Sequence, residues 1–548
     1  MLAKSGSHDA AKSQHVDSAV QCSKDPADEH TDHLYSGNAT LAQAGSEHEH
    51  SLTVLEALRG YPKAIFWSLV ISMAIIMEGY ATALVGNLYA YPTYAKQFGT
   101  RISGSDNYQI EARWQSAMGS GPQGGAFVGA FLNGWIVHRY GYKPAFSLAI
   151  LLMTCFICIS FFGFSIEKQA VGQVLCGIPW GMIATIGPAY ASEICPLKIR
   201  PFLTAYVNMC WTIGQFISAG VLKSFIDRTD EWAWRIPFGL QWMWMPALAV
   251  AAVFMPESPW HLIRKGRYSE AEQVVQKRLM SKQEQSHAPA LVALMIHTNK
   301  LEEDISAGTS YLDCFRGTDL RRTEVACVVF IGQVTCGAQF AYSATYFFQQ
   351  AGLNPDNAYA LNLGATAIGF VCSGVVWFLL NRVGRRRLYI TGMSLEALWL
   401  FIIGMLTFSK SPSAKWVQAA LCLVWLGTFH LSLGPVGWVI PAEVSSTRLR
   451  SKTVVLARNA YYLVICVANT IQPYMMNPAA WNWKGKAGFF WFGFAFLTAV
   501  WAFFRMPETR LRTYNELDLM FEAKLPTRKF RNHVINRLEI EDSPDVKA

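Results

Sequence analysis

The sequence predicts an all-α membrane protein in which twelve transmembrane helices form two six-helix halves. Hydrophobic residues make up 52% of the 548 residues and charged residues make up 16%, compared with about 25% in soluble domains. Twelve segments are apolar over the roughly 20 residues that a helix needs to cross a bilayer. Charged motifs that accompany the first six segments recur with the second six at a nearly constant spacing. Such a repeat indicates two parallel halves with a substrate site between them.

The predicted spans follow one another with short polar loops, except for one longer polar stretch between the sixth and the seventh. They cover residues 64–88, 114–137, 144–164, 169–191, 202–225, 236–255, 325–350, 358–380, 388–408, 416–440, 453–476 and 486–505. The N-terminal region is rich in Ser, Asp, Glu and His, which is typical of a disordered segment. We therefore expect five parts: a disordered cytosolic tail (1–60), a first half (61–255), a cytosolic linker with short helices (256–324), a second half (325–505) and a cytosolic tail (506–548).

Lysine and arginine residues concentrate in alternate loops, which sets the expected orientation. The richer loops, which include those at Lys143, Arg267 and Arg387, are expected to face the cytosol, so that both termini do so as well. This clustering accounts for the net charge of +9 and gives no reason to expect a nucleic-acid partner. The partners we expect are a small-molecule substrate and the lipid bilayer, for a chain that acts as a monomer.

The sequence does not indicate an enzyme. It contains no nucleophile–base constellation, no metal-ligand spacing and no phosphate-binding loop, so we expect no catalytic residue, no metal and no cofactor. Cys155 and Cys158 have a CxxC spacing, but they lie in a lipid-facing run without a nearby His or acidic residue. Small apolar core residues are the better interpretation of these cysteines.

The repeated charges suggest a gate. Glu193 and Arg200 are seven residues apart, about two helical turns, and the same spacing recurs at a matching place in the second half. We predict that the two acids pair with Arg139 or Arg382 and that ion pairs across the halves hold the cytosolic end shut. The alternative is that these residues only set the topology. The gating candidates are Arg139, Glu193, Arg200, Glu257, Arg382, Arg385, Glu443, Arg450 and Glu508.

Several of these motifs carry a resemblance to a known family. From about residue 54 to residue 530, the chain resembles the sugar porter family of the major facilitator superfamily, most closely the fungal maltose and general α-glucoside permeases. The motifs are Arg139-Tyr-Gly-Tyr-Lys143, Pro256-Glu-Ser-Pro259, Gly384-Arg-Arg386, Pro441-Ala-Glu443, Pro507-Glu-Thr509 and the strings Met77-Glu-Gly-Tyr80 and Val454-Val-Leu-Ala-Arg-Asn459. The resemblance implies a major facilitator fold and a sugar as substrate.

A sugar site needs hydrogen-bonding amides and flat aromatic surfaces. Side chains of these kinds inside predicted spans are Gln215, Gln333, Gln339, Asn362, Trp438, Asn459, Tyr461 and Tyr462. The resemblance implies that five of them line the cavity: Gln215, Gln333, Gln339, Trp438 and Tyr462. The alternative for a single amide in a membrane helix is an interhelical hydrogen bond.

Ionisable groups inside a membrane are costly and usually functional. Glu78 and Arg458 match charged positions of the α-glucoside permeases, which implies that they couple uptake to protons. His430 could titrate, or it could stay neutral with a hydrogen bond to a backbone carbonyl. Glu396 could lie nearer a membrane face than its place in the segment suggests. The chain departs from these relatives at Ala81 and Ala126, where they carry acids, and at His138 and Asn381, where the family usually carries Asp.

These observations favour a plasma-membrane transporter that takes up α-glucosides such as maltose, either coupled to protons or as a facilitator. Two alternatives stay open: a non-transporting sugar receptor, and a transporter of another metabolite, including an exporter. Only 43 residues follow Arg505, and known receptors of this kind usually carry longer cytosolic tails. The sequence leaves the exact sugar, the direction of transport and the coupling undecided.

Overall fold

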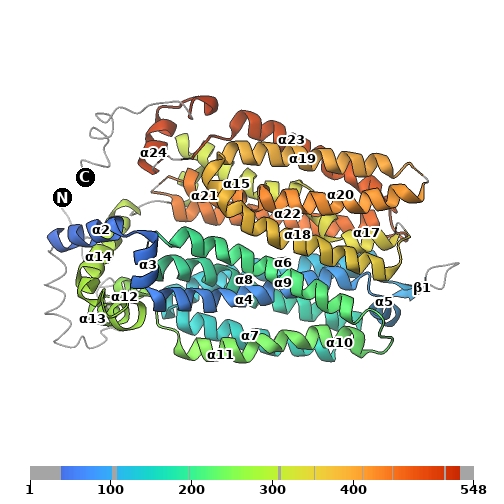
Figure 1. The fold of residues 1–548 in the computed structure, drawn as a ribbon, viewed down its shortest axis with the longest axis horizontal. Coiled ribbons are helices and arrows are strands. Elements are labelled where there is room, and N and C mark those ends of the chain that lie inside the picture. The colour runs from blue at the N-terminus through green and yellow to red at the C-terminus, as the bar shows by residue number, and fades with distance from the viewer. Residues whose placement is uncertain are drawn as a thin grey trace, which may run out of the picture.

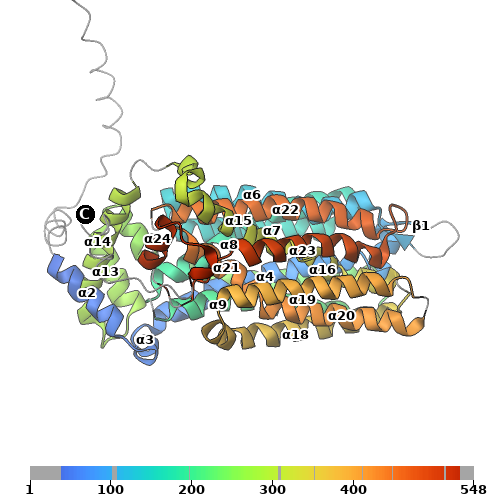
Figure 2. The ribbon, with the colours of Figure 1, turned by 90° about the horizontal axis from the view of Figure 1, so that it is seen from above.

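The computed structural model describes residues 39–101, 108–196, 198–306, 310–350, 352–409, 411–446, 448–510, 512 and 514–530. Long helices of the first half (blue to green) pack beside those of the second half (yellow to red), as Figure 1 and Figure 2 show. We call the end that carries the strands β1 (Thr100–Arg101) and β2 (Tyr108–Gln109) the hairpin end. We call the opposite end, with the helices α2, α3 and α12 to α14, the linker end.

The first half contains five continuous long helices and one that is interrupted. They are α4 (Pro62–Leu88), α6 (Ala112–Tyr140), α7 (Tyr142–Phe162), α8 (Ile166–Ile194), α9 (Arg200–Ser224), and the run of α10 (Trp232–Gly239), a 3-10 turn (Leu240–Met243) and α11 (Trp244–Phe254). A short helix, α5 (Pro92–Phe98), follows α4 at the hairpin end.

Two spans of the second half are broken near their middle. One consists of α15 (Gly317–Thr335), α16 (Ala338–Tyr342) and α17 (Ala344–Gln350); the break falls at Gly337, whose φ of 88° favours glycine. The other consists of α20 (Pro412–Leu431) and α21 (Leu433–Val444), which meet at Ser432. The unbroken helices are α18 (Pro355–Arg382), α19 (Arg385–Leu406), α22 (Arg450–Met476) and α23 (Ala487–Arg505), the last preceded by a 3-10 turn (Lys484–Lys486).

Ten helical segments of the described residues are long and apolar enough to cross a membrane. The two remaining predicted spans correspond to α6 and α9, which have 29 and 25 residues. These two helices form the interface between the halves, because α6 packs against α22 and α9 packs against α18.

Glycines let helix backbones within the first half touch. A Cβ atom at Gly129 of α6 would lie 2.0 Å from the carbonyl oxygen of Ile178 on α8, and one at Gly181 of α8 would lie 2.0 Å from that of Ala126. The same reciprocal contact joins Gly79 of α4 to α9. Small residues at helix interfaces allow this close approach.

We expect Gly129→Ala to lower the free energy of unfolding by about 1–3 kcal/mol, because the added methyl group overpacks the contact with α8. The control is Gly134→Ala on the same helix, where a Cβ atom would meet nothing within 4 Å. Melting temperatures of the detergent-purified variants test this expectation. Equal melting temperatures for the two variants would contradict it.

The prediction of a disordered tail over residues 1–60 is wrong for its second part, while residues 1–38 lie outside the described residues. Residues 39–60 form α2 (Ala39–Ser51) and α3 (Val54–Gly60), and a capping box between Thr53 and Glu56 starts α3. The polar composition suggested disorder, but α2 docks on α14 of the linker, where a Cβ at Gly45 would lie 2.4 Å from the Ala290 carbonyl oxygen. Packing of α2 against α14 thus stabilises a helix that the local sequence alone does not stabilise.

Short elements complete the linker end. They are α12 (Pro259–Arg264), α13 (Tyr268–Gln273), a π-helical turn (Val274–Leu279), 3-10 turns (Gln285–His287 and Tyr311–Phe315), α14 (Ala288–Ser306), α24 (Tyr514–Glu522) and a last 3-10 turn (Thr527–Lys529).

Candidate functional site

The two halves are held together toward the hairpin end. The side chain of Thr345 on α17 donates a hydrogen bond to Asn87 Oδ1 at the end of α4 (2.6 Å), and the Tyr359 hydroxyl on α18 donates to the Asn87 carbonyl oxygen (2.6 Å). Further bonds from the second half reach the first turns of α6 and the residues just before it, from Asn469 to the Gly119 carbonyl oxygen (2.9 Å) and from Asn477 to the Ile110 carbonyl oxygen (3.0 Å). An ion pair joins Lys223 to Asp356.

Nearer the middle of the bundle, the halves meet through rings and hydroxyl groups. The rings of Trp211 on α9 and Tyr342 on α16 pack edge to face, with centroids 6.0 Å apart. Thr212 Oγ1 lies 3.4 Å from Ser373 Oγ on α18, which lies 3.3 Å from His430 Nδ1 on α20. His430 is therefore bonded to a side chain, so the alternative of a backbone carbonyl partner is wrong.

Toward the linker end, the repeated acids form their ion pairs within one half. Glu193 accepts from Arg264 of α12 (2.7 Å) and from the Ser258 hydroxyl, and Glu443 accepts from Arg385 (3.1 Å). The predicted pairing of these acids with Arg139 or Arg382 is wrong for this conformation: the guanidinium of Arg139 lies over the Tyr140 ring. Arg382 is exposed.

Glu257 holds the first residues of α7, and Glu508 lies against Gly384 at the corresponding place in the second half. The carboxylate of Glu257 accepts from the backbone N–H groups of Tyr142 (2.7 Å) and Lys143 (3.1 Å). Burial raises the pKa of Glu257, while these bonds act in the opposite direction. A Cβ atom at Gly141 or at Gly384 would lie 2.5 or 2.1 Å from the corresponding carboxylate, so both motifs need glycine there.

His261 of α12 lies among the basic residues of the linker end. Burial and the nearby charges of Lys265 and Arg264 lower the pKa of His261 to about 4. Its imidazole is therefore neutral at neutral pH.

The remaining two repeated arginines begin helices at the same end of the bundle. Arg200 and Arg450 are the first residues of α9 and α22. Arg200 also donates a hydrogen bond to the Cys195 carbonyl oxygen (3.4 Å).

Arg458 lies at the centre of an aromatic cluster in the middle of α22. Its guanidinium lies 4.4 Å from the ring centroid of Trp438, 5.0 Å from that of Tyr461, 4.9 Å from that of Tyr462 and 5.8 Å from that of Phe330. Arg458 also donates a hydrogen bond to the Tyr462 hydroxyl (3.3 Å). We call these five residues the Arg458 cluster. Such cation–π contacts stabilise a cation that has left bulk water.

Glu78 faces the Arg458 cluster from the other half. Each of the two charges acts on the other, yet the described side chains do not form a direct ion pair. Glu78 is half-buried, and Trp438 beside Arg458 is 44% exposed. A half-buried acid of the first half and an arginine that lies against a partly exposed indole of the second half thus interact across the interface.

The predicted amides have different environments. Gln333 donates to the carbonyl oxygen of Gly434 on α21 (2.8 Å), so its nitrogen makes the interhelical bond that the alternative interpretation anticipated. Gln215 is buried beside the Tyr342 hydroxyl, with which it interacts. Gln339 and Asn459 are half-buried. The Nδ2 atom of Asn362 is buried without a hydrogen-bond partner among the described residues.

The structure therefore brings together Trp438, Tyr461, Tyr462 and Arg458. It adds Phe330 and Tyr342, which our sequence analysis did not propose as site residues. An aromatic residue in an apolar span carries no distinguishing signal, although Tyr342 packs against Trp211 of the other half. Glu396 is fully buried near the middle of α19.

Comparisons with known proteins identify the family of this chain. The family model described as "Sugar (and other) transporter" matches residues 67–521. The maltose permease MAL31 of Saccharomyces cerevisiae is 37% identical over 498 residues, which cover 90% of this chain and 81% of that protein. A general alpha-glucoside permease of the same species is 35% identical over 499 residues, with the same coverage.

Solved structures show the same fold. The proton:xylose symporter XylE bound to 6-bromo-6-deoxy-D-glucose superposes with a TM-score of 0.68 at 21% identity, covering 84% of this chain and 100% of that chain. A partially occluded inward open conformation of XylE from E. coli gives a TM-score of 0.67 at 20% identity, with 82% and 99% covered. The predicted major facilitator fold is thereby confirmed.

Proposed function

Because this chain belongs to the sugar transporter family, we propose that it takes up α-glucosides such as maltose across the plasma membrane together with protons, acting as a monomer. The observation that carries the proposal is the partly exposed indole of Trp438 against Arg458, which interacts with Glu78 of the other half. The names of the relatives, which are maltose and α-glucoside permeases, support the choice of substrate.

The proposed orientation puts the linker end, and with it both termini, in the cytosol. The excess of Lys and Arg in the loops of that end supports this choice. The hydrogen bonds around Asn87 then close the extracellular side, and the structure corresponds to an inward-facing state. Opening to the outside breaks the bonds from Thr345 and Tyr359 to Asn87 and brings the linker ends of the halves together.

In this mechanism the sugar binds between the halves. One face of a glucosyl ring packs on Trp438, because indole offers a large, flat apolar surface. The amides of Gln339 and Asn459 and the hydroxyl groups of the neighbouring tyrosines offer the donors and acceptors that sugar hydroxyl groups need. Several contacts of this kind bind an uncharged sugar together, and each is weak enough for the sugar to dissociate on the other side.

The coupling of sugar transport to proton transport depends on the distance between Glu78 and Arg458. An arginine that approaches a carboxylate favours its ionised form, and one that moves away favours proton binding. The two residues belong to different halves, so the movement that changes access also changes their separation. Glu78 therefore takes up a proton in one state and releases it in the other.

The test is uptake of radiolabelled maltose by yeast that lacks its own maltose transporters and expresses this chain. We expect accumulation that is faster at pH 5 than at pH 7 and that an uncoupler abolishes. Uptake that only equilibrates would identify a facilitator. No uptake by a correctly surface-localised protein would overturn the proposal in favour of a sugar receptor or a transporter of another metabolite.

We expect Trp438→Ala to raise the KM for maltose about tenfold, the equivalent of ~1.4 kcal/mol, with a smaller change in the maximal rate. The reason is that the substitution removes the stacking surface but leaves Glu78 and Arg458 in place. The control is Trp481→Ala, which removes an indole that is 53% exposed in the loop after α22. A KM for Trp438→Ala that matches this control would contradict the stacking role.

A further inference from the structure

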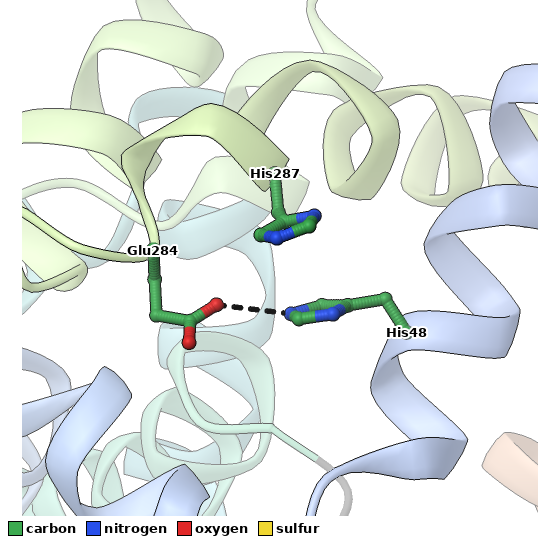
Figure 3. Close-up of side chains that lie close together, drawn as sticks. All are labelled: His48, Glu284 and His287. Carbon is green, nitrogen blue, oxygen red and sulfur yellow. Dashed lines mark ion pairs between the residues drawn. The ribbon is translucent and has the colours of Figure 1, made fainter.

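Two histidines and a glutamate from distant parts of the sequence meet at the linker end. His48 belongs to α2, and Glu284 and His287 belong to the turn before α14; Figure 3 shows the Glu284 carboxylate directed at the His48 ring, with the His287 ring stacked above it. One candidate ligand atom from each of the three residues lies within 4.8 Å of the other two. The sequence predicts no metal site here, because no spacing along the chain links residue 48 to residues 284 and 287.

The contacts within this group leave its polar atoms incompletely satisfied. His48 Nε2 lies 3.1 Å from Glu284 Oε2, yet both atoms are buried and neither makes a hydrogen bond of acceptable geometry among the described residues. The rings of His48 and His287 stack with centroids 3.9 Å apart and planes 9° apart. Imidazole and carboxylate groups that converge without hydrogen bonds match the ligands that a transition-metal ion accepts.

The distances also fit a metal ion. Zinc binds imidazole nitrogen at about 2.0–2.1 Å and carboxylate oxygen at about 2.0–2.2 Å, so neighbouring ligand atoms in a tetrahedral site lie roughly 3.3–3.5 Å apart. The separation of His48 Nε2 from Glu284 Oε2, 3.1 Å, is close to such an edge. His287 is exposed, so a rotation of its side chain can turn a ring nitrogen toward the other two ligands. Water can occupy the fourth position.

The surroundings hold the glutamate in place. A Cβ atom at Gly60, the last residue of α3, would lie 3.0 Å from the Glu284 side chain. The backbone N–H of Ser281 donates to the Gly60 carbonyl oxygen (2.8 Å), which ties the linker to the residue that precedes α4. Supporting contacts of this kind orient metal ligands.

We propose that His48, Glu284 and His287 form a binding site for Zn²⁺ or a similar divalent transition metal, and that the ion fastens α2 to the linker. Because α3 and α4 follow α2 directly, the ion braces the cytosolic entry to the first membrane helix under the proposed orientation. The binding itself is independent of the proposed transport activity.

The test uses the full chain purified in detergent with a tag that contains no histidine, after treatment with a chelator. We expect isothermal titration with ZnCl₂ to show one tight site and CoCl₂ to give the visible absorption of nitrogen- and oxygen-ligated Co²⁺. His48→Ala and His287→Ala should each weaken binding at least tenfold. The matched control is His297→Ala, which removes an exposed histidine of α14 outside the group.

A second measurement does not depend on affinity. Zn²⁺ should slow proteolytic cleavage between α2 and α3 in the wild-type chain and in His297→Ala, but not in His48→Ala. Unchanged zinc affinity and cobalt absorption in a His48→Ala and His287→Ala double variant would overturn the proposal, as would an equal loss of binding in His297→Ala. Either result would place the bound metal on other residues.

Discussion

Replacing Glu78 with glutamine is expected to abolish accumulation of maltose while leaving exchange across the membrane intact. Glutamine keeps the size and polarity of the side chain but cannot carry a proton between the two sides. Without that proton, the movement of sugar is no longer linked to the proton gradient. The internal concentration of radiolabelled maltose should stop at the external value, and uptake should lose its sensitivity to pH and to an uncoupler, while counterflow of preloaded maltose continues.

The matched control for this experiment is Glu396→Gln. Glu396 is the other carboxyl group that we singled out inside the membrane spans; it is fully buried on α19, and neither of its oxygens has a hydrogen-bond partner in the described part of the chain. Glu396→Gln leaves Glu78 and Arg458 in place, so this variant should still accumulate maltose. If Glu396→Gln loses accumulation and Glu78→Gln retains it, Glu396 is the proton carrier and the proposed pairing with Arg458 is wrong.

Replacing Arg458 with alanine is expected to reduce uptake to about 1% of the wild-type rate or less. This decrease corresponds to an activation free energy that is higher by about 2.7 kcal/mol. The substitution leaves Glu78 without the charge that acts on it across the interface, and an uncompensated charge inside the membrane is costly. It also removes the cation around which Trp438, Tyr461 and Tyr462 pack. Initial rates of maltose uptake, normalised to the amount of protein at the cell surface, provide the measurement.

Arg458→Lys separates the two contributions. Lysine keeps the positive charge but loses the flat guanidinium that lies against the aromatic rings, so we expect an intermediate rate. Arg113→Ala is the control, because the Arg113 side chain is 67% exposed and pairs with Glu111 at the hairpin end. Equal activity of Arg458→Ala and Arg458→Lys would show that the charge at this position does not contribute to transport.

Much of the membrane bundle could be predicted from the sequence, because about 20 consecutive apolar residues leave few structural choices. The α6 and α9 helices illustrate where this signal is weakest: both were predicted, although neither is among the ten described segments that are apolar enough to cross a membrane. Helix breaks could not be predicted in the same way. The break at Gly337 depends on a single left-handed residue, and many membrane helices contain glycine without a break.

The candidate site was predicted residue by residue, but its contacts were not. The residue types of Arg458, Trp438 and Tyr462 marked them as unusual inside a membrane span. That four aromatic residues surround Arg458 follows from the positions of α15, α21 and α22, which periodicity alone does not give. The partner of Glu193 was missed for the same reason, since Arg264 lies 71 residues away in a linker whose fold the sequence does not specify.

The glycine contacts of the first half determine where this molecule can bend. The backbones of α4 and α9, and those of α6 and α8, touch without side chains between them. One helix of such a pair cannot slide along the other without a steric clash. The interface between the halves, at α6 with α22 and at α9 with α18, is built instead from side-chain hydrogen bonds and rings, which can exchange partners. The first half should therefore move as a rigid body, and the conformational changes of the transport cycle should occur at the interface between the halves.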